Sequence, residues 1–290
     1  MEYFIRVDGG IGRCIASTGA ILEFAKTHTC SVVSSYPTIF DNIGLKVYPI
    51  DTPYLYEDKI SKGIYLEPEP YNDVAYYAEK KHLAQVFNKL LNGQDKMPEI
   101  KMVLTVNESN EAKAYVDSLK SQSGKKVLLL QPYASSGGHM MNNNLVEDET
   151  FRSLKPEFTD KLIEKLRKDY MIILVKDNSQ VTNKNTMVLN VDTRKYVALI
   201  PFVDAIICVD SFLQHAVAAL GNPVKTIVFW GGTKESNVGY SEQVGIRIKE
   251  VEDEPNRIPH NHQYYTSKNR GANDFTEEQI DKVLALLKAK

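Results

Sequence analysis

The sequence has little cysteine and no long apolar run, and both absences restrict where the protein works. The three cysteines, Cys14, Cys30 and Cys208, lie in or beside apolar stretches and form no C-x-x-C pair, which indicates buried thiols in a reducing compartment. No apolar run approaches the ~20 residues that span a bilayer. The chain opens on the strand-like MEYFIRV and shows no signal-peptide pattern. We therefore expect a cytoplasmic protein with no membrane span.

An excess of basic charge and the usual metal-binding patterns are also lacking. The chain has 35 Lys and Arg against 37 Asp and Glu, a net charge of −2. General affinity for nucleic acid or anionic membranes favours a strongly basic surface, so this balance does not support it, although a local basic patch is compatible. No Asp-x-Asp, H-E-x-x-H or clustered Cys/His pattern occurs. We expect neither a bound metal ion nor a cofactor.

What the sequence does contain is a repeated alternation of apolar runs with helical patterns. Short apolar stretches separated by helices are typical of parallel sheets buried on both faces. The alternation runs twice along the 290 residues, with the polar segment 121–125 between the two series. The sequence therefore predicts an α/β protein of two Rossmann-like, doubly wound domains facing across a cleft. These are residues 1–122 and 123–275. A helix at 276–290 follows, for which packing against the N-terminal domain is one option.

The same patterns predict individual elements. In the first half we expect strands at Tyr3–Val7, Cys30–Ser34 and Met102–Val106, and helices that end near Lys26, span Glu79–Asn92 and begin after Ser109. In the second half we expect strands at Val127–Leu130, Met171–Val175, Met187–Val191, Ala205–Val209 and Val224–Trp230, and helices at Phe158–Lys168, Arg194–Leu199 and Phe212–Leu220. The stretch from Asp51 to Tyr77 is irregular.

The turn at Asp210-Ser211 is the strongest signal for chemistry. An apolar strand ends there and a helix begins at once, with Ser211 near its N-cap. Helix starts present unpaired N–H groups and the positive end of the helix dipole, which favour a diphosphate. Ligands of open α/β sheets bind at the carboxyl ends of strands, where this turn lies. An ordinary capped β-α connection is the alternative.

Two further loops follow strands of the same half. Ser135 and Ser136 lie in a small, hydroxyl-rich loop, where backbone N–H and hydroxyl groups can approach a phosphate. The second loop is Gly231-Gly232-Thr233-Lys234, whose glycines allow close approach and whose Thr and Lys can complement negative charge. Taken alone, the serine loop is also compatible with a flexible surface loop, and the glycine loop fits a turn with a solvated lysine better than a phosphate site. Because all three junctions fall at strand ends of one half, we predict that they converge on one pyrophosphate.

Here the sequence resembles a known family. Asp210-Ser211, then His215-Ala-Val-Ala-Ala-Leu-Gly-Asn-Pro and Gly231-Gly232-Thr233, resembles the nucleotide-sugar site of the ADP-heptose:lipopolysaccharide heptosyltransferases, written D-[ST]-G-x-x-H-x-A-A-A-L-G-x-P and G-x-T. Pro132–Ser135 resembles the P-G-A-S loop of that family. Arg152–Phe158 resembles its K-x-W-P-x-x-F segment, with Arg152 or Lys155 replacing the phosphate-binding lysine. The resemblance implies the GT-B architecture, with the donor in the second domain, the acceptor in the first and no metal.

The departures from the family pattern concern the reacting groups. The glycine after Asp-Ser is Phe212 here, so the phosphate turn must differ or Phe212 must point away. The family opens I-R-L-x-x-I-G-D, and its proposed base is replaced by Arg13. Asp8 falls in the same loop, so we predict that it takes the proton of the acceptor hydroxyl, with a turn-capping residue as the alternative. Arg13 can bind an anionic acceptor group or the donor diphosphate.

The remaining candidates concern the donor and the acceptor. Asp177 follows a strand and can bind ribose hydroxyls, or it is a satisfied turn. The acceptor is a glycan hydroxyl or a hydroxymethylated DNA base of the kind that some bacteriophage glucosyl- and arabinosyltransferases modify. Candidate acceptor segments are the tyrosines at positions 54, 56, 65 and 71 and the loop Arg257–Arg270.

The function predicted from the sequence is a glycosyltransferase that uses a nucleotide sugar, with inversion and without a metal. The rival is a non-catalytic nucleotide-binding protein of the same fold, which the missing family aspartate favours. A dinucleotide oxidoreductase fits less well, because Ile15 stands where G-x-G-x-x-G requires its third glycine.

Overall fold

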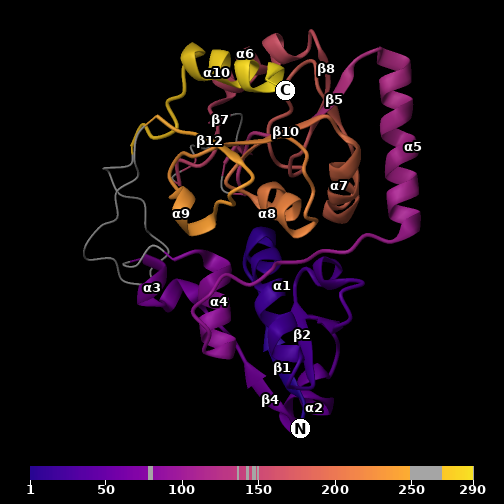
Figure 1. Cartoon of the computed structure of the whole chain (residues 1–290), viewed down its shortest axis with the longest axis vertical. Helices are drawn as coiled ribbons and strands as arrows, with labels where there is room; N and C mark the ends of the chain where they lie inside the picture. The colour runs from indigo at the N-terminus through magenta and orange to yellow at the C-terminus, as the bar shows by residue number, and fades with distance from the viewer. Residues whose placement is uncertain are drawn as a thin grey trace.

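The N-terminal part of the chain forms a small lobe around a four-stranded parallel sheet in the order β3-β2-β1-β4, called the N-lobe below (Figure 1). The computed structural model describes residues 1–77, 81–135, 137–141, 144, 145, 148, 150–248 and 270–289. The strands are β1 (Tyr3–Arg6), β2 (Cys30–Ser34), β3 (Lys46–Pro49) and β4 (Ile64–Leu66). The predicted β-α-β start is confirmed, whereas β3 and β4 fall in stretches where no strand was predicted.

Helices cover both faces of the N-lobe sheet. Helix α1 (Ile11–Ala25) packs against α4 (Leu83–Asn92) on one face, and its buried side chains are small or apolar. On the other face Leu55 of α2 (Leu55–Asp58) and Ile60 of the short helix η2 (Ile60–Lys62) pack on Phe4 and Val33. Three short elements complete the lobe: η1 (Pro37–Phe40), η3 (Pro70–Asn72) and α3 (Val74–Tyr77).

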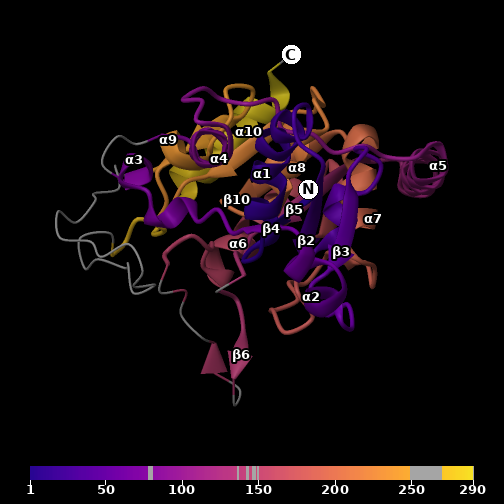
Figure 2. The same cartoon turned by 90° about the horizontal axis from the view of Figure 1, so that it is seen from below.

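The second lobe, the C-lobe, is built on a six-stranded parallel sheet in the order β12-β11-β10-β5-β8-β9. Its strands are β5 (Lys126–Gln131), β8 (Tyr170–Leu174), β9 (Met187–Val188), β10 (Ala205–Val209), β11 (Thr226–Phe229) and β12 (Val244–Ile246). A separate antiparallel hairpin, β6 (Met140–Met141) and β7 (Asn144–Leu145), projects from the body of the molecule (Figure 2). Strands β10 and β11 are buried throughout and β5 is buried from Val127 on, as their continuous apolar sequences predicted.

Alternate residues of the C-lobe strands face two separate cores. Leu129 and Ile206 belong to a core that also contains side chains of α5 (Val106–Ser123), α7 (Thr193–Leu199), α8 (Phe212–Ala219) and the N-lobe. Leu128 and Ile207 belong to the opposite core, which α6 (Pro156–Leu166) and α10 (Glu277–Lys288) cover. Helix α10 therefore packs on the C-lobe, far from the N-lobe (Figure 1), and packing against the N-terminal domain is not found.

The chain crosses between the lobes ahead of α5. Residues Met102–Val106 do not form the predicted strand; instead the Met102 N–H donates to Ala219 O at 2.9 Å. Helix α5 begins at Val106, because Thr105 and Glu108 form a reciprocal capping box, whereas Ser109 was expected to cap this helix. The helix contacts α7, β5 and β8, so it lies on the C-lobe although residues 1–122 were assigned to the N-terminal domain. Two short elements, η4 (Ile200–Phe202) and α9 (Glu235–Val238), complete the C-lobe.

The two lobes touch where α1 meets α8. A Cβ built on Gly12 would lie 2.5 Å from Cδ2 of His215, so only glycine at this position lets the helices come this close. Within the part of the chain that the structure describes, no helix is both long enough and apolar enough to cross a membrane.

Candidate functional site

The carboxyl ends of four adjacent C-lobe strands carry the residues predicted to bind the donor. Strands β11, β10, β5 and β8 are neighbours in the sheet and run parallel, with Val209 beside Phe229 and Cys208 beside Gln131. Asp210, Ser135, Asp177 and Gly231 follow these strands. The structure therefore brings the predicted loops to one edge of one sheet, which is the edge that faces the N-lobe at α8. Ser136 lies outside the described residues.

Gln131 joins the β5 and β10 junctions. Its side-chain amide donates to Ser211 Oγ at 3.0 Å, and its Oε1 accepts from the Leu213 N–H at 3.3 Å. Ser211 is the N-cap of α8, yet its hydroxyl makes no capping hydrogen bond. Phe212, which stands where the family has glycine, is half-buried and packs against the core that contains Leu129 and Ile206.

The glycines after β11 serve a contact within the chain. A Cβ on Gly231 would overlap Phe151 O, and a Cβ on Gly232 would overlap Thr150 O. The Gly232 N–H already donates to Phe151 O at 2.8 Å. Close backbone approach was expected here, and residues 150–152 of the same chain lie against both glycines. This packing holds Arg152 beside the strand ends.

Arg152 and Asp210 form the charged pair of this edge. A guanidinium nitrogen of Arg152 lies 3.7 Å from Asp210 Oδ2, and Oδ1 of Asp210 accepts from the Gln214 amide at 2.8 Å. Lys155, the other candidate for the phosphate-binding cation, sits at the N-cap of α6 and pairs with Asp274 at 2.5 Å. The structure therefore places Arg152, and not Lys155, at the predicted donor edge.

The loops after β5 and β8 contact each other. Ser135 is exposed, and its carbonyl accepts from His139 Nε2 at 2.8 Å. His139 Nδ1 lies 2.9 Å from the Ser179 hydroxyl, whose Oγ donates to Asp177 Oδ1. Hydrogen bonds from the Ser179 backbone and side chain lower the pKa of Asp177, so its carboxylate is ionised and able to accept ribose hydroxyls. Thr233 and Lys234 are half-buried beside α9.

His215 lies between the lobes and is 3% exposed. Its Nδ1 is 2.7 Å from the Tyr240 hydroxyl, and the other side of its ring meets Gly12. Burial lowers the pKa of His215 to about 4, so the imidazole is uncharged at neutral pH. The family motif predicted a donor contact at this histidine, whereas in this chain it packs α8 against α1.

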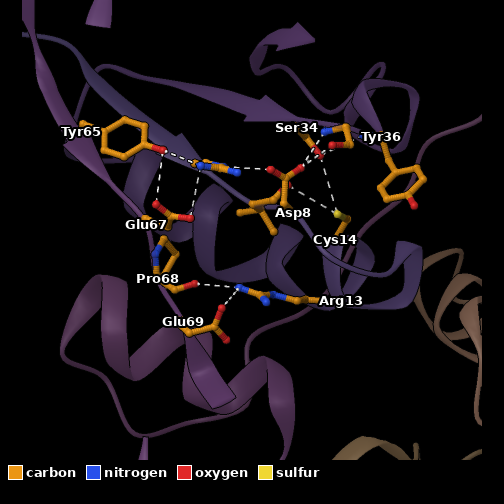
Figure 3. A network of polar contacts seen from close by, with 12 residues as sticks. Asp8, Arg13, Cys14, Ser34, Tyr36, Tyr65, Glu67, Pro68 and Glu69 are labelled. Atoms are coloured by element: carbon orange, nitrogen blue, oxygen red, sulfur yellow. Dashed lines mark hydrogen bonds and ion pairs between the residues drawn. The ribbon is translucent and has the colours of Figure 1, made fainter. Parts of the chain in front are cut away.

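Asp8 and Arg13 lie at the carboxyl edge of the N-lobe sheet in a polar network (Figure 3). Asp8 accepts from Arg6 Nε at 2.8 Å and from the Ser35 N–H and hydroxyl at 2.9 and 2.7 Å. Burial raises the pKa of Asp8, but the hydrogen bonds from Ser35 and Arg6 outweigh it, and the net pKa lies below the usual range. Arg13 pairs with Glu69 at 2.8 Å and donates to Pro68 O at 3.3 Å.

Sequence reasoning missed the partners in this network, namely Arg6, Ser35, Glu67 and Glu69. All four lie at strand ends, which is the same signal that identified the C-lobe residues. Glu67 and Glu69 went unnoticed because β4 was not predicted, so nothing marked them as residues at a sheet edge. No group of three or more His, Cys, Asp and Glu residues in the described ranges is arranged to hold a metal ion.

Two tyrosines lie where the lobes face each other. Burial raises the pKa of Tyr36, and the charges of Asp8 from the N-lobe and Asp177 from the C-lobe raise it further. Burial also raises the pKa of Tyr71, which Arg13 and Asp210 then shift in opposite directions. Because charges of both lobes act on each phenol, both edges lie near the contact between the lobes.

Comparison with solved structures identifies the architecture. The chain is similar to a glycosyl transferase family 9 protein from Veillonella parvula (TM-score 0.68, 11% identity, 99% and 97% of the two chains covered) and to E. coli ADP-heptose lps heptosyltransferase II (0.65, 12%, 99% and 98%). It is also similar to the iron-containing heptosyltransferase TibC from enterotoxigenic E. coli, in complex with ADP-D-β-D-heptose (0.61, 10%, 99% and 75%).

These likenesses show that the chain has the heptosyltransferase-like GT-B fold, as the sequence resemblance predicted. No family model and no curated sequence matches the chain. The likeness is therefore one of fold, at an identity where substrates do not transfer from one protein to another.

Proposed function

We propose that this protein is a glycosyltransferase that moves a sugar from a nucleoside diphosphate to a hydroxyl group. The observation that carries the proposal is that two polar sheet edges lie near the contact between the lobes, in a chain that shares the heptosyltransferase fold over nearly its whole length. The C-lobe edge has a helix start and Arg152 for a diphosphate, while the N-lobe edge has Asp8 for a hydroxyl. TibC binds an ADP-sugar, which makes ADP-sugars the first donors to test.

The proposed reaction is a single displacement with inversion, without a metal. Asp8 takes the proton of the acceptor hydroxyl, whose oxygen attacks the anomeric carbon. The bond between that carbon and the phosphate oxygen breaks, and its electron pair leaves with the nucleoside diphosphate. The N–H groups at the start of α8 and the guanidinium of Arg152 stabilise the charge that develops there. Closure of the lobes excludes water and limits donor hydrolysis.

The acceptor is a hydroxyl of a glycan or of a hydroxymethylated DNA base, and the protein works in the cytoplasm. Ser135, Asp177 and Lys234 complete the proposed donor site, because each follows one of the strands that end at the cleft. One proposed acceptor segment is the loop Arg257–Arg270. Residues 257–269 of this loop lie outside the described part of the chain. A non-catalytic nucleotide-binding protein of this fold is the alternative, favoured by the arginine that replaces the family aspartate.

Calorimetric titration with ADP, UDP, GDP, CDP and dTDP tests the donor site directly. We expect one nucleotide to bind, and Arg152→Gln to weaken it by about tenfold or more, because a charge-assisted contact to phosphate contributes about 1.5–3 kcal/mol. Arg167→Gln, an exposed arginine at the end of α6, is the matched control and should bind like the wild type. Release of the nucleotide from its sugar derivative then separates the enzyme from the non-catalytic alternative. If no nucleoside diphosphate binds, the proposed function is wrong.

A further inference from the structure

Tyr71 is an N-lobe residue whose ring is held in place by its neighbours. Its backbone N–H donates to Glu69 Oε1 at 3.1 Å, and Pro70 before it restricts the backbone at the start of η3. The ring lies edge-on to that of Tyr76, with centroids 5.3 Å apart and planes at 77°. The guanidinium of Arg13 lies 5.3 Å from the same ring. These contacts fix the direction of the phenol before any ligand arrives.

Both neighbours of the Tyr71 ring are themselves at the contact between the lobes. The Tyr76 carbonyl accepts from the side-chain amide of Asn237 in α9. Arg13 directly follows Gly12, the residue at which α1 meets α8. Figure 1 shows the same arrangement, with α9 next to α3 and α8 next to α1. Because α8 and α9 follow β10 and β11, the phenol is placed opposite the junctions at these two strand ends.

Charged groups of both lobes act on this phenol. Arg13 and Glu69 act from the N-lobe, and Asp210 and Arg152 act from the donor edge of the C-lobe. Burial raises the pKa of Tyr71, so the phenol keeps its proton at neutral pH. Tyr71 is half-buried, and its hydroxyl makes no hydrogen bond to the residues that the structure describes. A fixed, protonated hydroxyl without a partner offers one donor to a ligand.

The position of the phenol favours one part of the proposed donor. Asp210 and its partner Arg152 lie at the start of α8, where the proposed function places the diphosphate. The oxygens of Asp210 already contact Gln214 at 2.8 Å and Arg152 at 3.7 Å, which leaves the phenol proton for a ligand. The sugar has to face Asp8 of the N-lobe, so the phosphate next to the sugar is the one that an N-lobe residue reaches first. A hydroxyl also donates more strongly to a charged phosphate oxygen than to a neutral hydroxyl.

We infer that Tyr71 is a positioning residue for the donor, and that its hydroxyl donates a hydrogen bond to the phosphate that bears the sugar. This inference rests on the proposed function and deepens it, because a residue expected at the acceptor is assigned to the donor. The diphosphate is then held from both lobes, by Arg152 and the start of α8 on one side and by Tyr71 on the other. The same hydrogen bond stabilises the charge that collects on this phosphate as its bond to the sugar breaks.

Calorimetric titration of the full chain with two nucleotides tests this contact. The ligands are whichever of ADP, UDP, GDP, CDP and dTDP binds the wild type, and the monophosphate of the same nucleoside. Tyr71→Phe keeps the ring and its contacts but removes the hydroxyl. We expect it to weaken the diphosphate about tenfold, the effect of losing a hydrogen bond to a charged group. Monophosphate affinity should stay the same, because that ligand lacks the phosphate that Tyr71 contacts.

A matched control and a stability measurement separate recognition from folding. Tyr115→Phe removes the same atom from a tyrosine of α5, whose hydroxyl meets Met187, and should change neither affinity. Both variants should keep the melting temperature of the wild type within about 2 °C, since neither loses a buried hydrogen bond.

The comparison of the two nucleotides also separates this inference from the proposed function. Unchanged diphosphate binding by Tyr71→Phe overturns the inference alone, and so does an equal loss of both nucleotides, because recognition would then not concern the phosphate next to the sugar. If no nucleoside diphosphate binds the wild type, the proposed function fails and takes the role of Tyr71 with it.

Discussion

Asp8 shows how one side chain is prepared by its neighbours. The hydrogen bonds from Ser35 and Arg6 fix the direction of the carboxylate and keep it ionised. A fixed carboxylate at a strand end loses little conformational freedom when an acceptor hydroxyl arrives. The same contacts lower its pKa, so in the proposed reaction Asp8 takes the proton as the acceptor oxygen attacks the sugar.

Replacing Asp8 with Asn tests that role. Asn keeps an oxygen for the Ser35 hydrogen bonds but cannot take a proton, so we expect turnover to fall by about 10²-fold or more. Nucleoside diphosphate affinity, measured by calorimetry, should stay the same. Asp41→Asn, at an exposed position after η1, is the control. If Asp8→Asn retains full turnover, Asp8 is not the general base.

Arg194 has a structural role that no motif indicated. This buried arginine of α7 donates to Thr38 O of the N-lobe at 2.8 Å and to Val103 O at 2.6 Å, and it pairs with Glu108 of α5. The hydrogen bond from Arg194 is the main reason that the pKa of Glu108 falls to about 2. One guanidinium therefore joins the N-lobe, the crossing segment and α5.

Arg194→Met should be strongly destabilising. The variant leaves Glu108 and two partly buried carbonyl groups without their donor, which costs about 2–3 kcal/mol when hydrogen bonds to a charged group are lost. Urea unfolding monitored by circular dichroism gives the free energy of unfolding. Lys195→Met, an exposed neighbour on the same helix, should lie within about 0.5 kcal/mol of the wild type. A similar stability for the two variants would rule out this role for Arg194.

At the scale of elements, the contact between α1 and α8 depends on the absence of a side chain. Alanine is the better helix former by about 1 kcal/mol, so Gly12 works against the stability of α1 as an isolated helix. A glycine is found at position 12 because the ring of His215 occupies the space that a Cβ would need.

Gly12→Ala should therefore destabilise the protein despite its higher helix propensity. The added methyl group meets the His215 ring at 2.5 Å and forces α1 and α8 apart, with an expected cost of about 1–3 kcal/mol. Gly10→Ala is the control, because no atom lies within 4 Å of its Cβ position and its φ is −82°. The double variant Gly12→Ala/His215→Ala relieves the clash, so a double-mutant cycle of unfolding free energies should show a coupling between the two sites. Purely additive effects would contradict this account.

At the scale of the whole molecule, a row of uncharged aromatic and imidazole groups joins the lobes. His82 caps α4 by accepting from the Ala84 N–H, and its ring lies edge-on to Tyr240 with centroids 4.9 Å apart. Tyr240 in turn contacts His215. Burial, with a contribution from His215, lowers the pKa of His82 to about 4. Both imidazoles are therefore uncharged at neutral pH where the lobes pack together.

Acid should therefore weaken the folded state over a defined range. The ordinary pKa of a histidine is 6.5, whereas the pKa of His82 and of His215 is about 4 in the folded protein. Between pH 4 and pH 6.5 the unfolded chain therefore binds more protons than the folded chain. Stability is full above about pH 6.5 and is lost as the pH falls toward 4, by about 2 kcal/mol per histidine at pH 5. Urea unfolding at pH 7 and pH 5 measures the loss.

His82→Asn identifies the source of this pH dependence. Asn keeps an acceptor for the Ala84 N–H but does not titrate, so the difference in unfolding free energy between the two pH values should shrink. His28→Gln removes an exposed histidine and should leave the difference unchanged. If His82→Asn behaves like the wild type, another group is responsible for the acid sensitivity.

The sequence by itself determined the apolar strands, most of the helices and the polar turns at the C-lobe strand ends. Strands β2 and β10 have the predicted bounds, and β5, β8 and β11 differ by only one or two residues at each end. These features depend on residues that are close in the chain, where hydrophobic period and capping chemistry act. Strands β3, β4 and β12 escaped prediction because they have only three or four residues and partly exposed faces.

Only the tertiary structure decided which polar groups meet. Arg194 contacts Thr38, which is 156 positions away in the sequence. Arg152, and not Lys155, pairs with Asp210, and residues 150–152 pack against the glycines after β11. The sequence also did not decide which face of the sheet α10 covers, because an amphipathic helix suits any apolar face of matching size. Contacts of this kind depend on how two lobes and two sheet faces pack together, and no local pattern of residues encodes that packing.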